Sequence, residues 1–239
     1  MPPEQSQIIS HFFLKLFSGL YKTKKSHLYV KGLKIKNRLG LAAGLDKNAR
    51  LINEFDNIGF GFVEVGTITP KPQYGNPKPR IKRLISHESL LNSLGFPNEG
   101  VATIKPRLQK VRDDICLGVN IGPNKDTVPL EIVNDYLICY REVFKYADFV
   151  TINISSPNTP NLRSLHSIEN FKSVIDAILI ERSKYQKQPK IFIKISPDEE
   201  SSTYKDLIEN INDSAIDGVI ISNTSNNQNL KETLNVAHL

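Results

Sequence analysis

The chain has 239 residues, of which 39% are hydrophobic and 23% charged, as in ordinary globular proteins with a substantial core. Its net charge is +6, but no stretch combines dense arginine with stacking aromatics, so we expect no nucleic-acid partner. Cys116 and Cys139 form no CxxC pair, which argues against a zinc site and a disulfide framework. We expect two buried thiols and no bound metal.

The first 26 residues are predicted to form an amphipathic helix ahead of one larger domain at 27–239. Bulky apolar residues recur there at helical spacing: Ile8, Ile9, Phe12, Phe13, Leu16, Phe17 and Leu20. Lysines flank this face, and no apolar run approaches the roughly 20 residues that cross a bilayer. The pattern alone favours a helix packed on a core, and the alternative is a helix lying in a membrane interface.

Beyond this helix, six short β-branched runs are each followed by a small or polar turn. These runs are 39–43, 61–65, 115–119, 149–152, 190–195 and 217–221, and helical stretches fall near 48–57, 129–145, 168–185 and 201–214. Alternating strands and helices predict an α/β protein with a parallel sheet. About 50 residues separate the second and third runs, and we expect this segment to pass over the site.

Two architectures fit this order of elements. One is a doubly wound open sheet, and the other is a (β/α)₈ barrel that stops about two units short. No GxGxxG or GxxxxGK[ST] motif is present, which argues against a dinucleotide-binding fold. In both architectures the chemistry takes place at the carboxyl ends of the strands.

Amide and lysine side chains gather at these strand ends. The amides are Asn92, Asn120, Asn153, Asn158 and Asn223, and the lysines are Lys47 and Lys194. An amide offers both a donor and an acceptor, which suits a ring with alternating N–H and C=O groups, such as a pyrimidine or a flavin edge. Lysine adds positive charge for a carboxylate or an electron-rich flavin. No hydrolytic triad is present at the strand ends, which leaves Ser156 as the candidate proton acceptor.

Seven segments resemble one family in order and in content. They are AAGLDKN, GFVEVGTITPKPQYGNPKPR, LLNSLGF, GVNIGPNK, INISSPNTPNLR, IKISPD and DGVIISNT. They resemble the class 2 dihydroorotate dehydrogenases, which are membrane-associated and reduce quinones. The resemblance implies a (β/α)₈ TIM barrel with FMN at the carboxyl ends of its strands. It also implies that the N-terminal helix docks on the membrane, which reverses the reading from its pattern alone.

The resemblance also implies roles for individual residues. FMN would contact Ala43, Gly44, Leu45, Asp46, Lys47, Thr67, Asn120, Asn153, Lys194 and Ser222. The substrate would contact Lys47, Asn92, Ser93, Leu94, Gly95, Phe96, Asn153, Asn158, Asn223 and Thr224. Ser156 would take a proton from C5 of dihydroorotate while hydride leaves C6 for the flavin. A quinone would then accept the electrons, and the protein would lie peripherally on the cytoplasmic side of a bacterial cell membrane.

Three departures from the family pattern qualify this reading. Ser222 stands where the family usually has threonine, and the N-terminal segment holds one helix where the family has two. The sequence ends at Leu239, before the family's glycine-rich loop and last two strands. We therefore expect a truncated chain with an incomplete barrel of about six units, which binds FMN weakly or not at all and has little activity. The alternatives are an inactive fragment or half-barrel remnant, and an enzyme that uses NAD or fumarate as acceptor.

Overall fold

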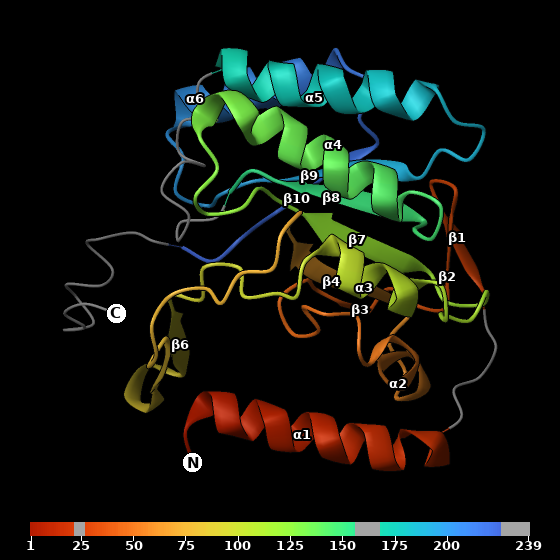
Figure 1. Cartoon of the computed structure of the whole chain (residues 1–239), viewed down its shortest axis with the longest axis vertical. Coiled ribbons are helices and arrows are strands. Elements are labelled where there is room, and N and C mark those ends of the chain that lie inside the picture. The colour runs from red at the N-terminus through yellow and green to blue at the C-terminus, as the bar shows by residue number, and fades with distance from the viewer. Residues whose placement is uncertain (22–26, 156–167, 226–239) are drawn as a thin grey trace.

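The computed structural model describes residues 1–21, 27–155 and 168–225, and a curled six-stranded parallel sheet lies at its centre (Figure 1). The strands are β3 (Gly40–Leu41), β4 (Phe62–Ile68), β7 (Leu117–Ile121), β8 (Phe149–Asn153), β9 (Lys190–Lys194) and β10 (Gly218–Ile220). Their order in the sheet is β10-β9-β8-β7-β4-β3, and every neighbouring pair is parallel. All six predicted strands are therefore present, in the sequential order of a barrel.

Helices follow the strands and pack on the outer face of the sheet. They are α2 (Ile52–Asn57), α3 (Val101–Leu108), α4 (Ile132–Val143), α5 (Ile168–Ser183) and α6 (Ser201–Asn212), with a short 3₁₀ turn, η3 (Pro129–Glu131), before α4. The four predicted helices are confirmed with shorter bounds. Helix α3 was not predicted, and it occupies the end of the segment that we expected to be a long excursion. Pro106 within it weakened the helical pattern of the sequence.

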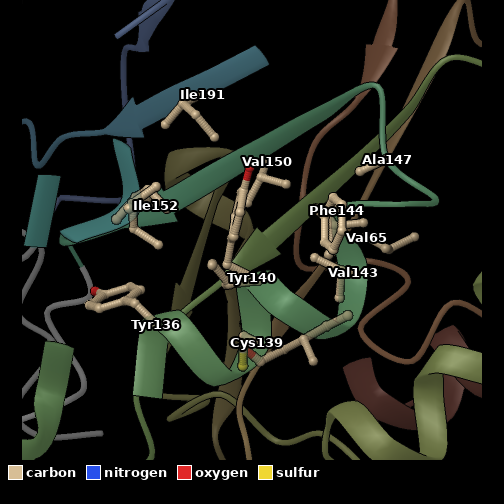
Figure 2. Close-up of a cluster of buried hydrophobic side chains, with 14 of the residues drawn as sticks. Val65, Tyr136, Cys139, Tyr140, Val143, Phe144, Ala147, Val150, Ile152 and Ile191 are labelled. Atoms are coloured by element: carbon tan, nitrogen blue, oxygen red, sulfur yellow. The ribbon is translucent and has the colours of Figure 1, made fainter. Parts of the chain in front are cut away.

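The outer face of the sheet carries the main hydrophobic core. Residues that alternate along the strands, such as Val65, Val150, Ile152 and Ile191, are fully buried there. Figure 2 shows these residues against the apolar side of α4, which contributes Tyr136, Cys139, Tyr140 and Val143, with Phe144 directly after the helix. Cys139 and Cys116 are buried free thiols, as the sequence predicted, and burial raises the pKa of Cys116 to about 12. This apolar layer fixes which side chains of each strand face inward.

On the inner face, phenylalanine rings cover glycines at the amino ends of the strands. Gly40 pairs with Phe62, Gly118 with Phe149, and Gly218 with Phe192 across neighbouring strands. Phe149 contacts both other rings, with centroids 6.2 Å from Phe62 and 5.2 Å from Phe192. Large and small residues thus alternate across neighbouring strands at the amino end of the barrel interior.

Two antiparallel hairpins lie at opposite ends of the sheet (Figure 1). The first, β1 (Leu28–Val30) with β2 (Leu33–Ile35), packs Leu28, Leu33 and Ile35 against the phenylalanine layer. The second, β5 (Ile81–Leu84) with β6 (Ser89–Asn92), is joined by the 3₁₀ turn η2 (Ile85–His87) and lies on the side of the carboxyl ends. Neither hairpin was predicted, because strands of three or four residues carry little periodicity.

Helix α1 (Pro3–Phe17) continues into the 3₁₀ turn η1 (Ser18–Leu20) and lies along the barrel wall (Figure 1). Glu4 forms an ion pair with Arg80 at 2.9 Å, and Gln7 Nε2 donates to the carbonyl of Leu45 at 2.9 Å. The opposite face remains exposed, with Phe12 at 64% and Leu16 at 61%. Among the described residues, no helix is both long and apolar enough to cross a membrane.

The phenylalanine layer predicts a strong cost for a small change. A Cβ at Gly118 would lie 2.1 Å from the ring of Phe149. We expect Gly118→Ala to lower the free energy of unfolding by about 1–3 kcal/mol, because the ring cannot move without displacing its neighbours. Gly19→Ala is the control, since nothing lies within 4 Å of a Cβ there. Urea unfolding of the two variants compares them, and equal stability would contradict the packing of this layer.

Candidate active site

A cavity of about 220 Å³ opens at the carboxyl ends of the strands. It is lined by Ala43, Gly44, Lys47, Thr67, Asn92, Leu94, Gly95, Phe96, Asn153, Lys194, Asn223 and Thr224. These residues come from the ends of β3, β4, β6, β8, β9 and β10. All of them were predicted site residues, and the structure brings them together from separate parts of the chain.

A hydrogen-bonded network of amides forms the floor of the site. Thr67 Oγ1 donates to Asn120 Oδ1 at 2.6 Å, and Asn153 Nδ2 donates to both Thr67 Oγ1 and Asn120 Oδ1 at 3.0 and 3.1 Å. Asn120 Nδ2 in turn donates to Glu64 Oε1 at 3.0 Å, and the other oxygen of Glu64 accepts from the backbone N–H of Ala43. Asn120 is fully buried behind the cavity, so it orients Asn153 and Thr67, which line it.

Two lysines face this cavity. Lys194 is only 8% exposed and, in the described part of the chain, forms no hydrogen bond or ion pair. Lys47 donates to the carbonyl of Gly44. The pKa of Lys47 is lowered to about 8, first by burial and then by the positive charges of Arg80 and Lys194, against the opposing effect of Asp46. A cation in such surroundings gains strongly from a bound anion.

The turn at 43–47 places its side chains on two sides. Gly44 has φ +119°, which favours glycine, and it lets the backbone approach the cavity. Asp46 is buried and faces away, where its carboxylate accepts the backbone N–H groups of Arg50 and Leu51 at 2.9 and 2.8 Å. These bonds satisfy the backbone N–H groups of the two residues before α2. The helix begins at Ile52, which is later than the predicted start near residue 48. Leu45 is 41% exposed and lies beneath α1, outside the cavity.

The β8 and β10 ends meet through polar side chains. Asn223 Nδ2 donates to Ser155 Oγ at 3.1 Å, and Ser155 Oγ donates to Asn153 Oδ1 at 3.2 Å. Ser222 does not line the cavity, and its hydroxyl donates to the carbonyl of Asn223. Ser93 also lies behind the cavity, with its carbonyl bonded to Asn76. The predicted base Ser156 and the predicted substrate ligand Asn158 lie outside the described residues.

The sequence reading missed three residues of the site. Glu64 carries the amide network, Ser155 connects β8 to β10, and Arg80 adds a buried cation near Lys47. The sequence could have indicated Glu64, because a carboxylate between two valines in a strand buried on both faces needs a polar partner. Arg80 carried no such signal, since its place depends on the path of the excursion after β4.

The lining residues define the chemistry that the cavity can support. Amides and hydroxyls supply donors and acceptors, two lysines supply positive charge, and no carboxylate or histidine lies among the described lining residues. No group of three or more potential metal ligands occurs in the described ranges. The site therefore fits a planar, anionic, nitrogen-containing ring with several hydrogen-bonding edges.

Comparison with known proteins shows the family of the chain. The dihydroorotate dehydrogenase family model matches residues 26–238. A dihydroorotate dehydrogenase (quinone) of Aliivibrio fischeri (strain MJ11) is 44% identical over 207 residues, which is 85% of this chain and 62% of that protein. The enzyme of the same name from Pseudoalteromonas atlantica is 45% identical over 198 residues, 81% of this chain and 59% of its own.

The fold is also that of solved members of the family. A crystal structure of DHODH from Eimeria tenella, in complex with ferulenol, superposes with a TM-score of 0.86 at 35% identity and covers 97% of this chain and 69% of that one. The chain thus spans about 60% of the length of the curated relatives that it matches. By its sequence and its fold, the chain belongs to the dihydroorotate dehydrogenase family.

Proposed function

We propose that this chain carries the flavin and substrate site of an enzyme that oxidises dihydroorotate to orotate and passes the electrons to a quinone. The main support is the convergence of Lys47, Thr67, Asn153, Lys194 and Asn223 on one cavity. The quinone is proposed because the curated relatives cited above are named for it. NAD and fumarate lack this support.

FMN is the cofactor that the residues of the cavity fit. Lys194 is a buried cation without an anionic partner in the described chain, and burying such a charge is unfavourable unless a ligand compensates it. Asn120, Asn153 and Thr67 present oriented amides and a hydroxyl beside it. The Ala43–Gly44 backbone allows close approach of a flat ring. When bound, FMN supplies a hydride acceptor.

The chain's own residues would bind and orient the substrate. The Lys47 ammonium would pair with the substrate carboxylate, because no described carboxylate of this chain forms an ion pair with it. The amides of Asn92, Asn153 and Asn223 would bond the alternating N–H and C=O groups of the pyrimidine ring. Fixing the ring in this way lowers the entropic cost of reaching the reactive geometry.

Ser156 is the proposed base for the proton at C5. It directly follows Ser155, whose hydroxyl and carbonyl both bond Asn223. The contacts of this sequence neighbour with the β10 end support Ser156 as the proposed base, and Asn158 two residues later is proposed to bind the same ring. A serine has a high intrinsic pKa, so its proton must leave through the site or through water.

Helix α1 is the proposed contact with the membrane that holds the quinone. We propose residues 1–26 as a membrane-associated segment and residues 27–239 as the catalytic domain, on the cytoplasmic side of the cell membrane. The exposed apolar residues of α1 and its continuation are Ile8, Ile9, Phe12, Phe13, Leu16, Phe17 and Leu20. With Lys15 on the helix, this is the composition of an interfacial helix.

The central test is reduction of bound flavin by dihydroorotate. The purified chain, supplied with excess FMN under anaerobic conditions, should lose its visible flavin absorbance when dihydroorotate is added. We expect Ser156→Ala to slow this reduction by about 10²–10⁴-fold, the usual contribution of a general base. Ser183→Ala on α5 is the control, because its hydroxyl bonds only the local carbonyl of Ile180. A wild-type chain that binds FMN but is not reduced would refute the proposal.

The pKa of Lys47 predicts how substrate affinity depends on pH. Below its pKa of about 8 the side chain is charged and can pair with a carboxylate, and above it the charge is lost. Orotate affinity should therefore fall roughly tenfold per pH unit above pH 8. Lys47→Met should weaken binding at pH 7 and remove this slope. Lys105→Met is the control, since Lys105 pairs with Glu142 at 2.7 Å on the surface. Calorimetric titration measures both, and an unchanged slope in Lys47→Met would exclude this role.

The membrane contact predicts a specific loss in a flotation assay. The double variant Phe12→Glu with Leu16→Glu places two charges on the exposed face of α1, so it should no longer float with vesicles that contain anionic lipid. Its stability should stay within about 0.5 kcal/mol of wild type, because both side chains are exposed. Ile208→Glu, at a 47% exposed position of α6, should float like wild type. Equal flotation of all three proteins would argue against α1 as the membrane contact.

A further inference from the structure

The loop Asn92–Phe96 lines the cavity but takes its shape from two residues outside it. Asn76 Nδ2 donates to the carbonyl of Ser93 at 2.8 Å, and the backbone N–H of Asn76 donates to the carbonyl of Leu94 at 3.1 Å. Gln73 Nε2 donates to the carbonyl of Gly95 at 3.1 Å. Two residues thus bond three consecutive carbonyls of this loop.

The loop β7–α4 fixes the orientation of both amides. Gln73 Oε1 accepts from Asn124 Nδ2 at 2.9 Å and from the backbone N–H of Lys125 at 3.0 Å. Asn76 Oδ1 accepts from Lys125 Nζ at 2.9 Å. Because each amide oxygen faces donors on this side, each amide nitrogen must face the loop carbonyls on the other.

Asn124 is itself held by the barrel. Its backbone N–H donates to Asp135 Oδ2 on α4 at 2.9 Å, and its Oδ1 accepts from the backbone N–H of Lys71 at 2.9 Å. The hydroxyl of Thr127 donates to the same carboxylate oxygen at 2.6 Å. A continuous set of hydrogen bonds therefore runs from α4 through two amide side chains to the loop at the cavity.

The conformation of the loop requires such support. Phe96 has φ +50°, which non-glycine residues seldom adopt, and Gly95 has φ +66°. A Cβ at Gly95 would lie 2.9 Å from the side chain of Asn76, so the two residues are in close contact. Strained backbone of this kind persists where the surrounding structure holds it.

We propose that Gln73 and Asn76 are positioning residues that set the affinity for the substrate. They act through Leu94, Gly95 and Phe96, which line the cavity, while neither of them lines it. The residues proposed to hold FMN lie outside this loop, in the turn after β3 and on the ends of β4, β7, β8 and β9. The inference rests on the proposed function, since it takes the ligand of this loop to be dihydroorotate.

The test removes a single donor and keeps the shape of the side chain. Gln73→Glu keeps the oxygen that accepts from Asn124 and Lys125 but places a carboxylate oxygen against the carbonyl of Gly95. We expect the dihydroorotate concentration that gives half-maximal flavin reduction to rise roughly tenfold. The limiting rate of reduction and the Kd for FMN should stay within about twofold, because the residues that serve them are unchanged.

Two further variants separate this effect from charge and from general destabilisation. Asn76→Asp loses the donor to Ser93 but gains an ion pair with Lys125, so it should raise the half-saturating concentration while remaining stable. Gln188→Glu is the matched control, because Gln188 Nε2 donates to the carbonyl of Tyr185 at 3.2 Å on the surface. It should leave the half-saturating concentration unchanged.

The outcomes distinguish this inference from the proposed function. If Gln73→Glu lowers the limiting rate or FMN affinity as much as it weakens substrate binding, or changes none of them, the positioning role is wrong. If dihydroorotate fails to reduce the wild-type flavin, the proposed function is wrong. In that case amide hydrogen exchange decides the positioning role: residues 93–96 should exchange faster in Gln73→Glu than in Gln188→Glu, and equal exchange would overturn it.

Discussion

Both faces of the central strands β4, β7 and β8 are buried, and this constraint governs the rest of the structure. Side chains alternate along each strand, so one set must pack against the helices and the other must fill the barrel interior. The outer set is aliphatic, as at Val119, Ile152 and Ile193, which are fully buried. The inner set changes along the strands, from phenylalanine and glycine at the amino ends to amides and lysine at the carboxyl ends. A polar group in that place needs a partner, which is either a neighbouring side chain or a ligand.

Some polar side chains of the inner layer form hydrogen bonds with one another, and others face the cavity. Glu64, Asn120 and Thr67 bond one another and hold Asn153 in one orientation. Lys194 has no such partner among the described residues, and Lys47 bonds only a backbone carbonyl there. The polar layer is therefore hydrogen-bonded behind the cavity and lysine-lined where it faces the cavity. Preorganised polar groups of this kind bind and orient a reacting ring without having to rearrange.

Segments outside the barrel are tied to the site by side chains that bond backbone. Gln7 on α1 bonds the carbonyl of Leu45, next to the turn that carries Lys47. Glu4 pairs with Arg80, whose charge lowers the pKa of Lys47. The segment that follows β4 is bonded to the loop after β7, because Gln73 accepts hydrogen bonds from Asn124 and Lys125. Helix α1 and the loop Asn92–Phe96 thus both lie near the carboxyl ends of the strands, where the proposed chemistry takes place.

The sequence by itself determined the six strands and four of the helices, and it marked the amides and lysines at the strand ends, because alternating Ile and Val in strands and polar residues at their ends are local patterns that reflect burial. The other lining residues, such as Gly44, Thr67 and Phe96, were expected only from the resemblance to the family. Only the tertiary structure decided that Asp46 caps a turn, that Asn120 supports Asn153 from behind, and that Arg80 lies near Lys47. The two hairpins, α3 and the hydrogen bond from Gln73 to the loop Asn92–Phe96 were also visible only in the tertiary structure. Some of these features depend on contacts between residues far apart in the sequence, such as Asn120 with Asn153 and Gln73 with Gly95. Others, such as the hairpins, are elements too short to carry a periodic signal in the sequence.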